Sequence, residues 1–281
     1  MGLLDPGSVA RSYLRRALGA GLGAAARLRG TRAEARIIYY HRIDDEMHRS
    51  CVSPAAFRAQ MELLRDRGYR VVALADLARG LSGREGFAPR TVAITFDDGF
   101  ADNYQHAFPA LSALGLPATI FVATGAVGGS LRVLRDRPGD LPALTWAQIR
   151  EMQQGGITIG SHTVSHPHLT RCSAEALARE LADSRAAIAA ETGVATDLFC
   201  YPHGDEDETV RTAVRAAGYR LAVATRPGPV TAGSDPLALA RTFIARDDSL
   251  ADFERKLAGA FDVLHHGVQW LRRGWRSARA A

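Results

Sequence analysis

Two adjacent carboxylates and two histidines four residues apart are the side chains of this sequence whose types and spacing could perform chemistry. Asp97 and Asp98 follow an apolar run at residues 91–96, and His162 and His166 follow another that ends at residue 160. Imidazole and carboxylate groups are ligands of divalent metal ions, and three protein ligands leave one position open for water. A divalent ion lowers the pKa of bound water from about 16 towards about 7, which favours hydrolysis. The pattern therefore indicates a hydrolytic metal site.

The four side chains divide between metal binding and proton transfer. Histidines at i and i+4 lie on one face of a helical turn, so His162 and His166 could present two imidazoles to one cation. Asp98 adds an anionic oxygen to this pair. Neighbouring side chains at the end of a strand diverge, so one aspartate can bind the metal while the other accepts a proton from water.

Three short segments follow predicted strands: TFDDG at residues 95–99, SHTVSH at 161–166 and FCYPHG at 199–204. They resemble the first, second and third motifs of the polysaccharide deacetylase family, the carbohydrate esterases that share the NodB homology domain. The resemblance extends over residues 37–248. It implies a metal-binding hydrolase of carbohydrate metabolism that acts on carbon–nitrogen bonds other than peptide bonds.

The resemblance also implies roles for individual residues. It makes Asp97 the catalytic base and a backbone amide near Tyr201 or His203 the donor to an oxyanion. It implies a divalent ion, most commonly zinc, with three protein ligands: Asp98, His162 and His166.

The third motif departs from the family's pattern in two places. Asp197 stands where the family often has an arginine that orients the catalytic aspartate, and His203 stands where it usually has tyrosine. The late Leu-x-His motif, whose histidine is the general acid, has no clear counterpart. His203 and His41 are therefore the candidate proton donors, because His41 also ends an apolar run and a subgroup of the family begins with a similar Tyr-His pair.

Strands and helices are predicted to alternate along the chain. Apolar runs occur at residues 36–40, 69–73, 91–96, 117–123, 156–160, 198–201, 219–224 and 238–244. Helical stretches between most of them predict βαβ units and a parallel sheet closed into a barrel. The resemblance implies that this is the distorted parallel (β/α) barrel of the NodB type. The clearest helix covers residues 174–192, with Ser173 as its cap and Gly193 at its end. The candidate site residues follow strands at the end where such barrels assemble active sites: His41, Asp97, His162 and His203.

Composition predicts one catalytic domain with a basic segment at each end. The 281 residues are 47% hydrophobic and 23% charged, as in a soluble globular protein. We expect a catalytic domain at residues 36–262, a basic amphipathic segment at 1–35 and a basic helix or tail at 263–281. The first segment is too interrupted for a membrane span or a signal peptide. It favours a cytoplasmic or membrane-peripheral location, and a loop at 124–143 is expected beside the substrate.

Charge and cysteine content bear on partners. The net charge of +5 comes almost entirely from arginine, and without a basic patch that contains aromatic residues we expect no nucleic-acid partner. The basic termini suit a membrane surface but also ordinary packing. The three cysteines have no paired spacing, so they are expected to be structural thiols.

The sequence thus predicts a metal-dependent hydrolase that removes N-acetyl groups from amino sugars of a polysaccharide, an oligosaccharide or a lipid-linked glycan. An O-deacetylase or another amide hydrolase would use the same residues. A catalytically silent glycan-binding homologue is a separate alternative, suggested by the missing arginine and the missing late histidine. A membrane-associated scaffold that uses the two basic ends is a third.

Overall fold

The computed structural model describes residues 33–83, 86–131, 139–260 and 262. Residues 33–247 form one compact unit, and the described residues from 248 onward fall in a second. The second unit contains helix α8 (Leu250–Leu257), which begins with a capping box formed by Ser249 and Asp252. The predicted terminal segments lie almost wholly outside the described residues, so the domain boundaries and membrane contacts stay predictions.

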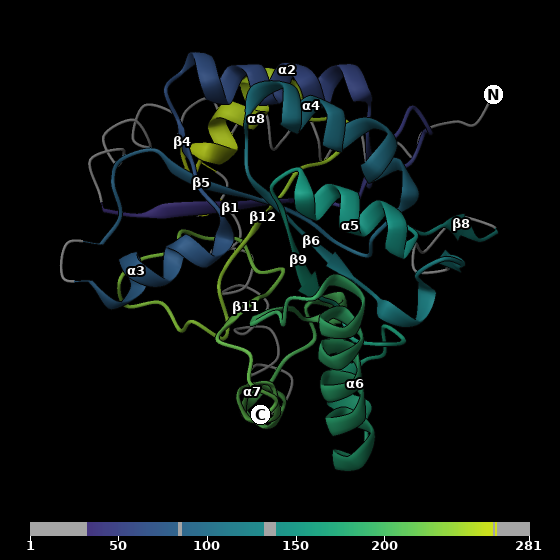
Figure 1. The fold of residues 1–281 in the computed structure, drawn as a ribbon. Coiled ribbons are helices and arrows are strands. Elements are labelled where there is room, and N and C mark those ends of the chain that lie inside the picture. The colour runs from purple at the N-terminus through teal and green to yellow at the C-terminus, as the bar shows by residue number, and fades with distance from the viewer. Residues whose placement is uncertain (1–32, 84–85, 132–138, 261, 263–281) are drawn as a thin grey trace, which may run out of the picture. The chain divides into compact units, whose positions relative to one another are not determined.

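An eight-stranded parallel sheet is the centre of the first unit (Figure 1). Its strands in spatial order are β11 (Leu221–Val223), β10 (Leu198–Cys200), β9 (Ile157–Ser161), β6 (Ala118–Val122), β5 (Thr91–Phe96), β1 (Ala35–Tyr40) and β12 (Thr242–Phe243), with β4 (Arg70–Val71) also paired to β5. Each of the eight predicted apolar runs overlaps one of these strands. Their buried faces on both sides explain the continuous apolar runs, as expected for parallel strands covered by helices.

The segment that leads into β12 approaches both edges of the sheet. Leu239 forms a parallel bridge with Val223 of β11, and Thr242 pairs with Ile38 of β1. The sheet is therefore curled, which confirms the expected distorted α/β barrel. Inside the curled sheet, a Cβ atom at Gly160 would lie 2.4 Å from the Phe121 ring, so only glycine leaves room for this ring in the core.

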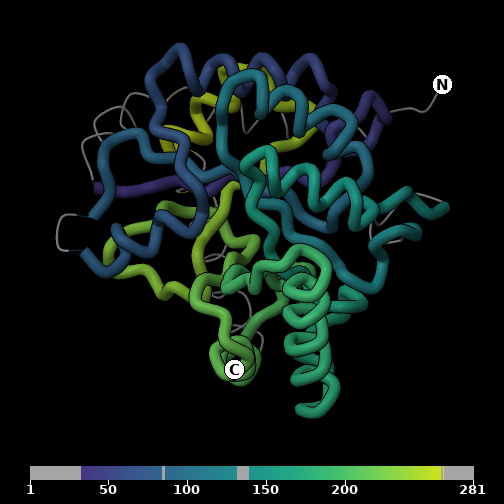
Figure 2. The backbone as a smooth tube through the Cα atoms, in the orientation of Figure 1, coloured from purple at the N-terminus to yellow at the C-terminus, as the bar shows by residue number. Residues whose placement is uncertain are grey.

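Helices alternate with the strands and lie outside the sheet (Figures 1 and 2). The α-helices of this unit are α2 (Pro54–Asp66), α3 (Leu77–Ser82), α4 (Phe108–Leu114), α5 (Trp146–Gln154), α6 (Ala174–Thr192) and α7 (Glu208–Ala216). Short turns are η1 (Leu74–Asp76), η2 (Asn103–Ala107), η3 (Thr124–Ala126), η4 (Leu169–Arg171) and η5 (Pro202–Gly204). Two small sheets add β2 (Arg42–Ile43) with β3 (Cys51–Val52), and β7 (Ser130–Leu131) with β8 (Leu141–Pro142). None of the described helices is long and apolar enough to cross a membrane.

Helix α6 has the boundaries that the sequence predicts. The Ser173 hydroxyl accepts a hydrogen bond from the third amide beyond it, and Gly193 ends the helix with a φ of 73°. Glu175 and Arg179 form an i, i+4 ion pair at 2.8 Å. The buried face consists of Leu177, Leu181, Ser184 and Ile188.

The loop at residues 124–143 is attached to the rim where the catalytic motifs end. Its first residue donates a backbone hydrogen bond to the Thr163 carbonyl (3.0 Å), and Leu144, just beyond the loop, donates to Gly99 (2.9 Å). The loop therefore begins and ends beside the first two motifs. Residues 132–138 are outside the described part, and contact with substrate stays a prediction.

Candidate metal and catalytic site

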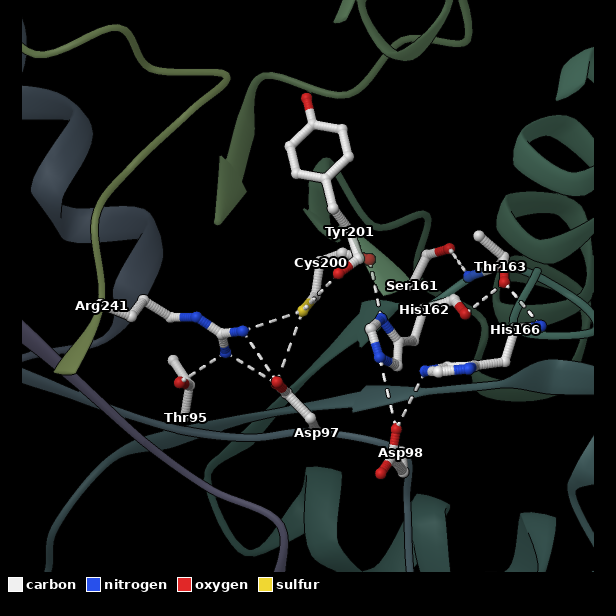
Figure 3. A network of polar contacts seen from close by, with 10 residues as sticks. All are labelled: Thr95, Asp97, Asp98, Ser161, His162, Thr163, His166, Cys200, Tyr201 and Arg241. Carbon is white, nitrogen blue, oxygen red and sulfur yellow. Dashed lines mark hydrogen bonds and ion pairs between the residues drawn. The ribbon is translucent and has the colours of Figure 1, made fainter. Parts of the chain in front are cut away.

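Asp98, His162 and His166 converge on one point at the carboxyl ends of β5 and β9 (Figure 3). The Asp98 Oδ1 atom lies 3.4 Å from the Nε2 atom of each histidine. Zinc–ligand distances of about 2.0–2.1 Å in a tetrahedral site separate neighbouring ligand atoms by about 3.3 Å. The three donor atoms are thus spaced as the ligands of one such ion would be.

A backbone hydrogen bond sets the tautomer of His162. Its Nδ1 atom lies 2.7 Å from the carbonyl oxygen of Cys200, which can only accept a hydrogen bond. Nδ1 therefore carries the hydrogen, and the lone pair is on Nε2, which faces Asp98. Metal-binding histidines are commonly oriented in this way by a carbonyl group.

The loop that carries His166 is irregular, so the expected helical turn is wrong. Thr163 and His166 have φ values of 68° and 58°, in the left-handed region that costs non-glycine residues about 1–2 kcal/mol each. Side chains stabilise this path: the Thr163 hydroxyl accepts from the His166 amide (3.0 Å), and Glu180 of α6 accepts from the amides of Val164 (2.8 Å) and Ser165 (2.9 Å). The loop brings both imidazoles together without a helix.

Asp97 points away from Asp98, as expected for adjacent residues at a strand end. Its two carboxylate oxygens accept hydrogen bonds from Arg241 at 2.6 and 2.7 Å. Arg241 is fully buried and also donates to the Ala224 carbonyl (2.9 Å) and the Thr95 hydroxyl (3.2 Å). The Tyr39 ring lies 4.2 Å from its guanidinium carbon. This bidentate pair fixes both the position and the charge of Asp97.

Both aspartates stay ionised in spite of their burial. Burial alone would raise the pKa of Asp97, but the charge and hydrogen bonds of Arg241 outweigh it and lower that pKa. Burial likewise opposes ionisation of Asp98, and the adjacent imidazoles of His162 and His166 lower the pKa of Asp98 well below its usual range. Two adjacent carboxylates therefore keep their charges because each faces a different set of partners.

Arg241 is the site residue that the sequence analysis missed. The expected arginine position is occupied by Asp197, which directly precedes β10, and Arg241 from the segment before β12 supplies the cation instead. One signal was available, because Arg241 is the only charged residue of the apolar run at 238–244. A charge in a buried strand requires a partner, and Asp97 is that partner.

The Cys200 thiol lies between the two members of this pair. Its Sγ atom is 3.1 Å from Nη2 of Arg241 and 3.5 Å from Oδ1 of Asp97. Burial raises the pKa of this thiol, so it is protonated and can donate to Asp97. Asp97, His162 and Cys200 also gather donor atoms within 4.8 Å, but the bond to Arg241 and the neutral thiol make this a poorer metal site. All three cysteines are free, as expected.

His41 is partly buried and lies near the two aspartates, directly after β1. Burial lowers the pKa of His41, opposed mainly by the charges of Asp98 and Asp97. Its Nδ1 atom is buried and has no hydrogen-bond partner among the described residues. The side-chain amide of Asn103 donates to the His41 carbonyl (2.9 Å) and fixes the backbone here. The structure thus places His41 near the candidate base and a candidate metal ligand.

His203 lies on the other side of the metal ligands. Its ring centroid is 4.5 Å from that of His166 and 4.0 Å from that of His168, which stacks on it. Tyr201 has a structural role, because its amide donates to the Val223 carbonyl (3.3 Å) and its ring points away from the aspartates (Figure 3). The Tyr201 amide is therefore engaged in the sheet, and an oxyanion contact by the His203 amide stays a prediction.

Comparisons with known proteins agree with this geometry. A family model described as polysaccharide deacetylase matches residues 84–222. The Bacillus subtilis protein YxkH, named as a polysaccharide deacetylase, is 32% identical over 209 residues, which cover 74% of this chain and 71% of that protein. A Staphylococcus aureus poly-beta-1,6-N-acetyl-D-glucosamine N-deacetylase is 23% identical over 219 residues, 75% of this chain and 73% of its own length.

A solved structure is similar to this chain over most of its length. The Streptococcus pyogenes deacetylase PplD, in complex with acetate, superposes with a TM-score of 0.70 and 28% identity over 80% of this chain and 98% of its own. The sequence match, the curled parallel sheet and the paired aspartates at its rim lead to one assignment. The chain belongs to the polysaccharide deacetylase family and is a hydrolase that acts on carbon–nitrogen bonds.

Proposed function

We propose that this chain is a metal-dependent N-deacetylase that releases acetate from N-acetylglucosamine units of a polysaccharide. The observation that carries the proposal is that Asp97 and Asp98, although adjacent, have different partners. Asp98 faces two imidazoles at the spacing of metal ligands, and Asp97 is kept ionised by Arg241. The name of the Staphylococcus aureus relative supports the substrate class.

Asp98, His162 and His166 would hold the ion, and their two nitrogen donors and one carboxylate oxygen suit zinc. When bound, the ion would lower the pKa of a water molecule and polarise the acetyl carbonyl group. The Cys200 carbonyl and Glu180 would keep the two imidazoles in position.

Asp97 would accept the proton of the attacking water, since Arg241 maintains its unprotonated form. His41, protonated to imidazolium under the influence of the Asp98 and Asp97 charges, would then donate a proton to the leaving amine nitrogen, because that nitrogen cannot depart as an anion. The amide of His203 would donate a hydrogen bond to the developing oxyanion. Because Arg241 pairs with Asp97, the arginine missing from the third motif is replaced. This favours an active enzyme over a catalytically silent homologue.

The direct test uses oligomers of β-1,6-linked N-acetylglucosamine and mass spectrometry. We expect loss of single acetyl groups with the full-length protein, no loss after removal of metal by a chelator, and recovery when zinc is added. O-acetylated oligomers without N-acetyl groups serve as the comparison substrate. Unchanged turnover after verified metal removal would refute the metal mechanism, and preference for the O-acetylated oligomers would refute the substrate assignment.

Removal of either histidine ligand is expected to abolish tight metal binding. His162→Ala and His166→Ala each leave two of three protein ligands, so their zinc content after dialysis should be far below one ion per chain. His168→Ala is the matched control, because His168 lies on the same rim but binds Asp205 instead (3.5 Å). Stoichiometric zinc in both ligand variants would show that the assignment is wrong.

Loss of the proton donor is expected to depend on the leaving group. His41→Ala should slow hydrolysis of the acetamide at least about tenfold more than hydrolysis of an activated aryl acetate, because an aryloxide leaves without protonation. Both rates are measured with zinc content confirmed, and His203→Ala is the parallel variant. Equal losses on both substrates would assign His41 a positioning role, and a selective loss in His203→Ala alone would transfer the donor role to His203.

A further inference from the structure

A cavity lies at the end of the sheet opposite the candidate catalytic residues. It has a volume of about 660 Å³ and is lined mainly by Arg185, Asp197, Arg215, Gly218, Tyr219 and Arg220. Asp197 directly precedes β10 and Arg220 directly precedes β11, whereas the catalytic residues follow the carboxyl ends of their strands. We call this cavity the arginine pocket. Its position separates it from the deacetylase site.

The arginines of this pocket are not neutralised by the protein. The side chains of Arg215 and Arg220 are exposed, and neither forms an ion pair or hydrogen bond within the described part of the chain. Arg211, one turn earlier on the same helix α7, is paired with Glu206 and Glu208. Asp197 forms no ion pair there either, so three cations and one anion leave the pocket with net positive charge.

Arg185 is held in place as a fixed member of the pocket. Its Nε atom donates to the Thr196 carbonyl oxygen (2.9 Å), and it is partly buried. Gly218, with a φ of 90°, lies against it, and a Cβ atom there would be 3.4 Å from the guanidinium carbon. Both Nη groups make no hydrogen bond to a described residue, so they are available to a ligand.

We propose that the arginine pocket binds a phosphate group. Guanidinium groups match phosphate oxygens in two-point hydrogen bonds, and a phosphate has enough oxygens to engage several of them. A carboxylate, by contrast, is satisfied by one guanidinium. Three like charges in one cavity repel one another, one carboxylate offsets only part of that repulsion, and a bound phosphate relieves the rest. The phosphate is either free or part of a lipid headgroup.

Calorimetric titration of the zinc-loaded, full-length protein with inorganic phosphate tests the proposal. Ionic strength is held constant with chloride, because screening alone changes such affinities. The variant Arg215→Ala/Arg220→Ala should bind phosphate at least about tenfold more weakly than the parent, since two charge-assisted hydrogen-bond donors are lost. Arg58→Ala/Arg70→Ala removes the same charge from two exposed arginines whose side chains form no ion pair with another described residue, and it should change the affinity less than twofold.

Phosphate at the catalytic ion is distinguished by enzyme kinetics. That binding would inhibit deacetylation competitively, and the inhibition constant should be the same in the parent and both double variants. The pocket variant should also keep the parent kcat and KM for a soluble oligomer. The calorimetric result does not require turnover, so it is independent of the proposed function.

Vesicles reveal the source of the phosphate. If the source is a lipid headgroup, the parent should bind vesicles that contain phosphatidylglycerol but not vesicles of phosphatidylcholine. Only the pocket variant should then lose this binding. Equal vesicle binding in all three proteins, with the calorimetric difference retained, assigns the pocket to free phosphate. Unchanged phosphate affinity in the pocket variant, or equal weakening in the two double variants, would overturn the proposal.

Discussion

Replacement of Asp97 by asparagine is expected to reduce kcat by about 10²-fold or more while zinc content stays at the parent level. The amide has nearly the same shape as the carboxylate but cannot accept the proton of water, and a positioned general base contributes about 10²–10⁴-fold. The substitution also leaves the buried Arg241 without an anion. We therefore expect a loss of about 3–5 kcal/mol in the free energy of unfolding, the usual effect of breaking a buried ion pair.

The measurements are single-turnover rates, zinc content and denaturant unfolding of the same preparations. Asp183→Asn makes the same chemical change at an exposed position of α6 and should leave all three unchanged. A near-parent rate in Asp97→Asn would remove Asp97 from the mechanism. Loss of zinc in that variant would instead favour the alternative ligand group of Asp97, His162 and Cys200.

The strands and the longest helix could be predicted because their buried residues form apolar patterns that are visible in the sequence. Parallel strands covered on both faces leave continuous apolar runs, and each predicted run overlaps a strand of the sheet. Helix α6 carries its own start and stop signals in Ser173 and Gly193. The same reasoning placed Asp97, His162 and His41 at one rim, because the carboxyl ends of parallel strands meet there.

Features that depend on distant contacts could not be predicted. The partner of Asp97 is 144 residues away in the chain, and no periodicity connects the two positions. The i, i+4 spacing of His162 and His166 suggested a helical turn, but hydrogen bonds to Thr163 and Glu180 stabilise an irregular loop with left-handed residues instead. Local spacing identified the candidate ligands, whereas tertiary contacts determined their geometry.

The role of Arg241 predicts a shift in the pH dependence of the enzyme. Burial alone raises the pKa of Asp97, and Arg241 is the main group that lowers it. In the parent, the base is active above this lowered pKa and is lost only as the pH falls through it. Arg241→Met removes the opposing charge, so the pKa of Asp97 rises and the acid limb of the kcat profile should move to higher pH. We expect a loss of about 10²-fold in kcat at pH values where the parent is fully active, and an unfolding free energy about 3–5 kcal/mol lower.

Comparison variants separate this effect from general destabilisation. Arg241→Lys keeps a positive charge but cannot donate to both oxygens of Asp97, so its acid limb should lie between those of the parent and Arg241→Met. Arg36→Met removes another buried arginine, in β1 and remote from the site, and should lower stability without moving the limb. Zinc content is measured at each pH, because protonation of the histidine ligands would also reduce activity in acid. If Arg241→Met loses stability but keeps the parent's acid limb with zinc bound, Arg241 supports the fold and does not control the charge of Asp97.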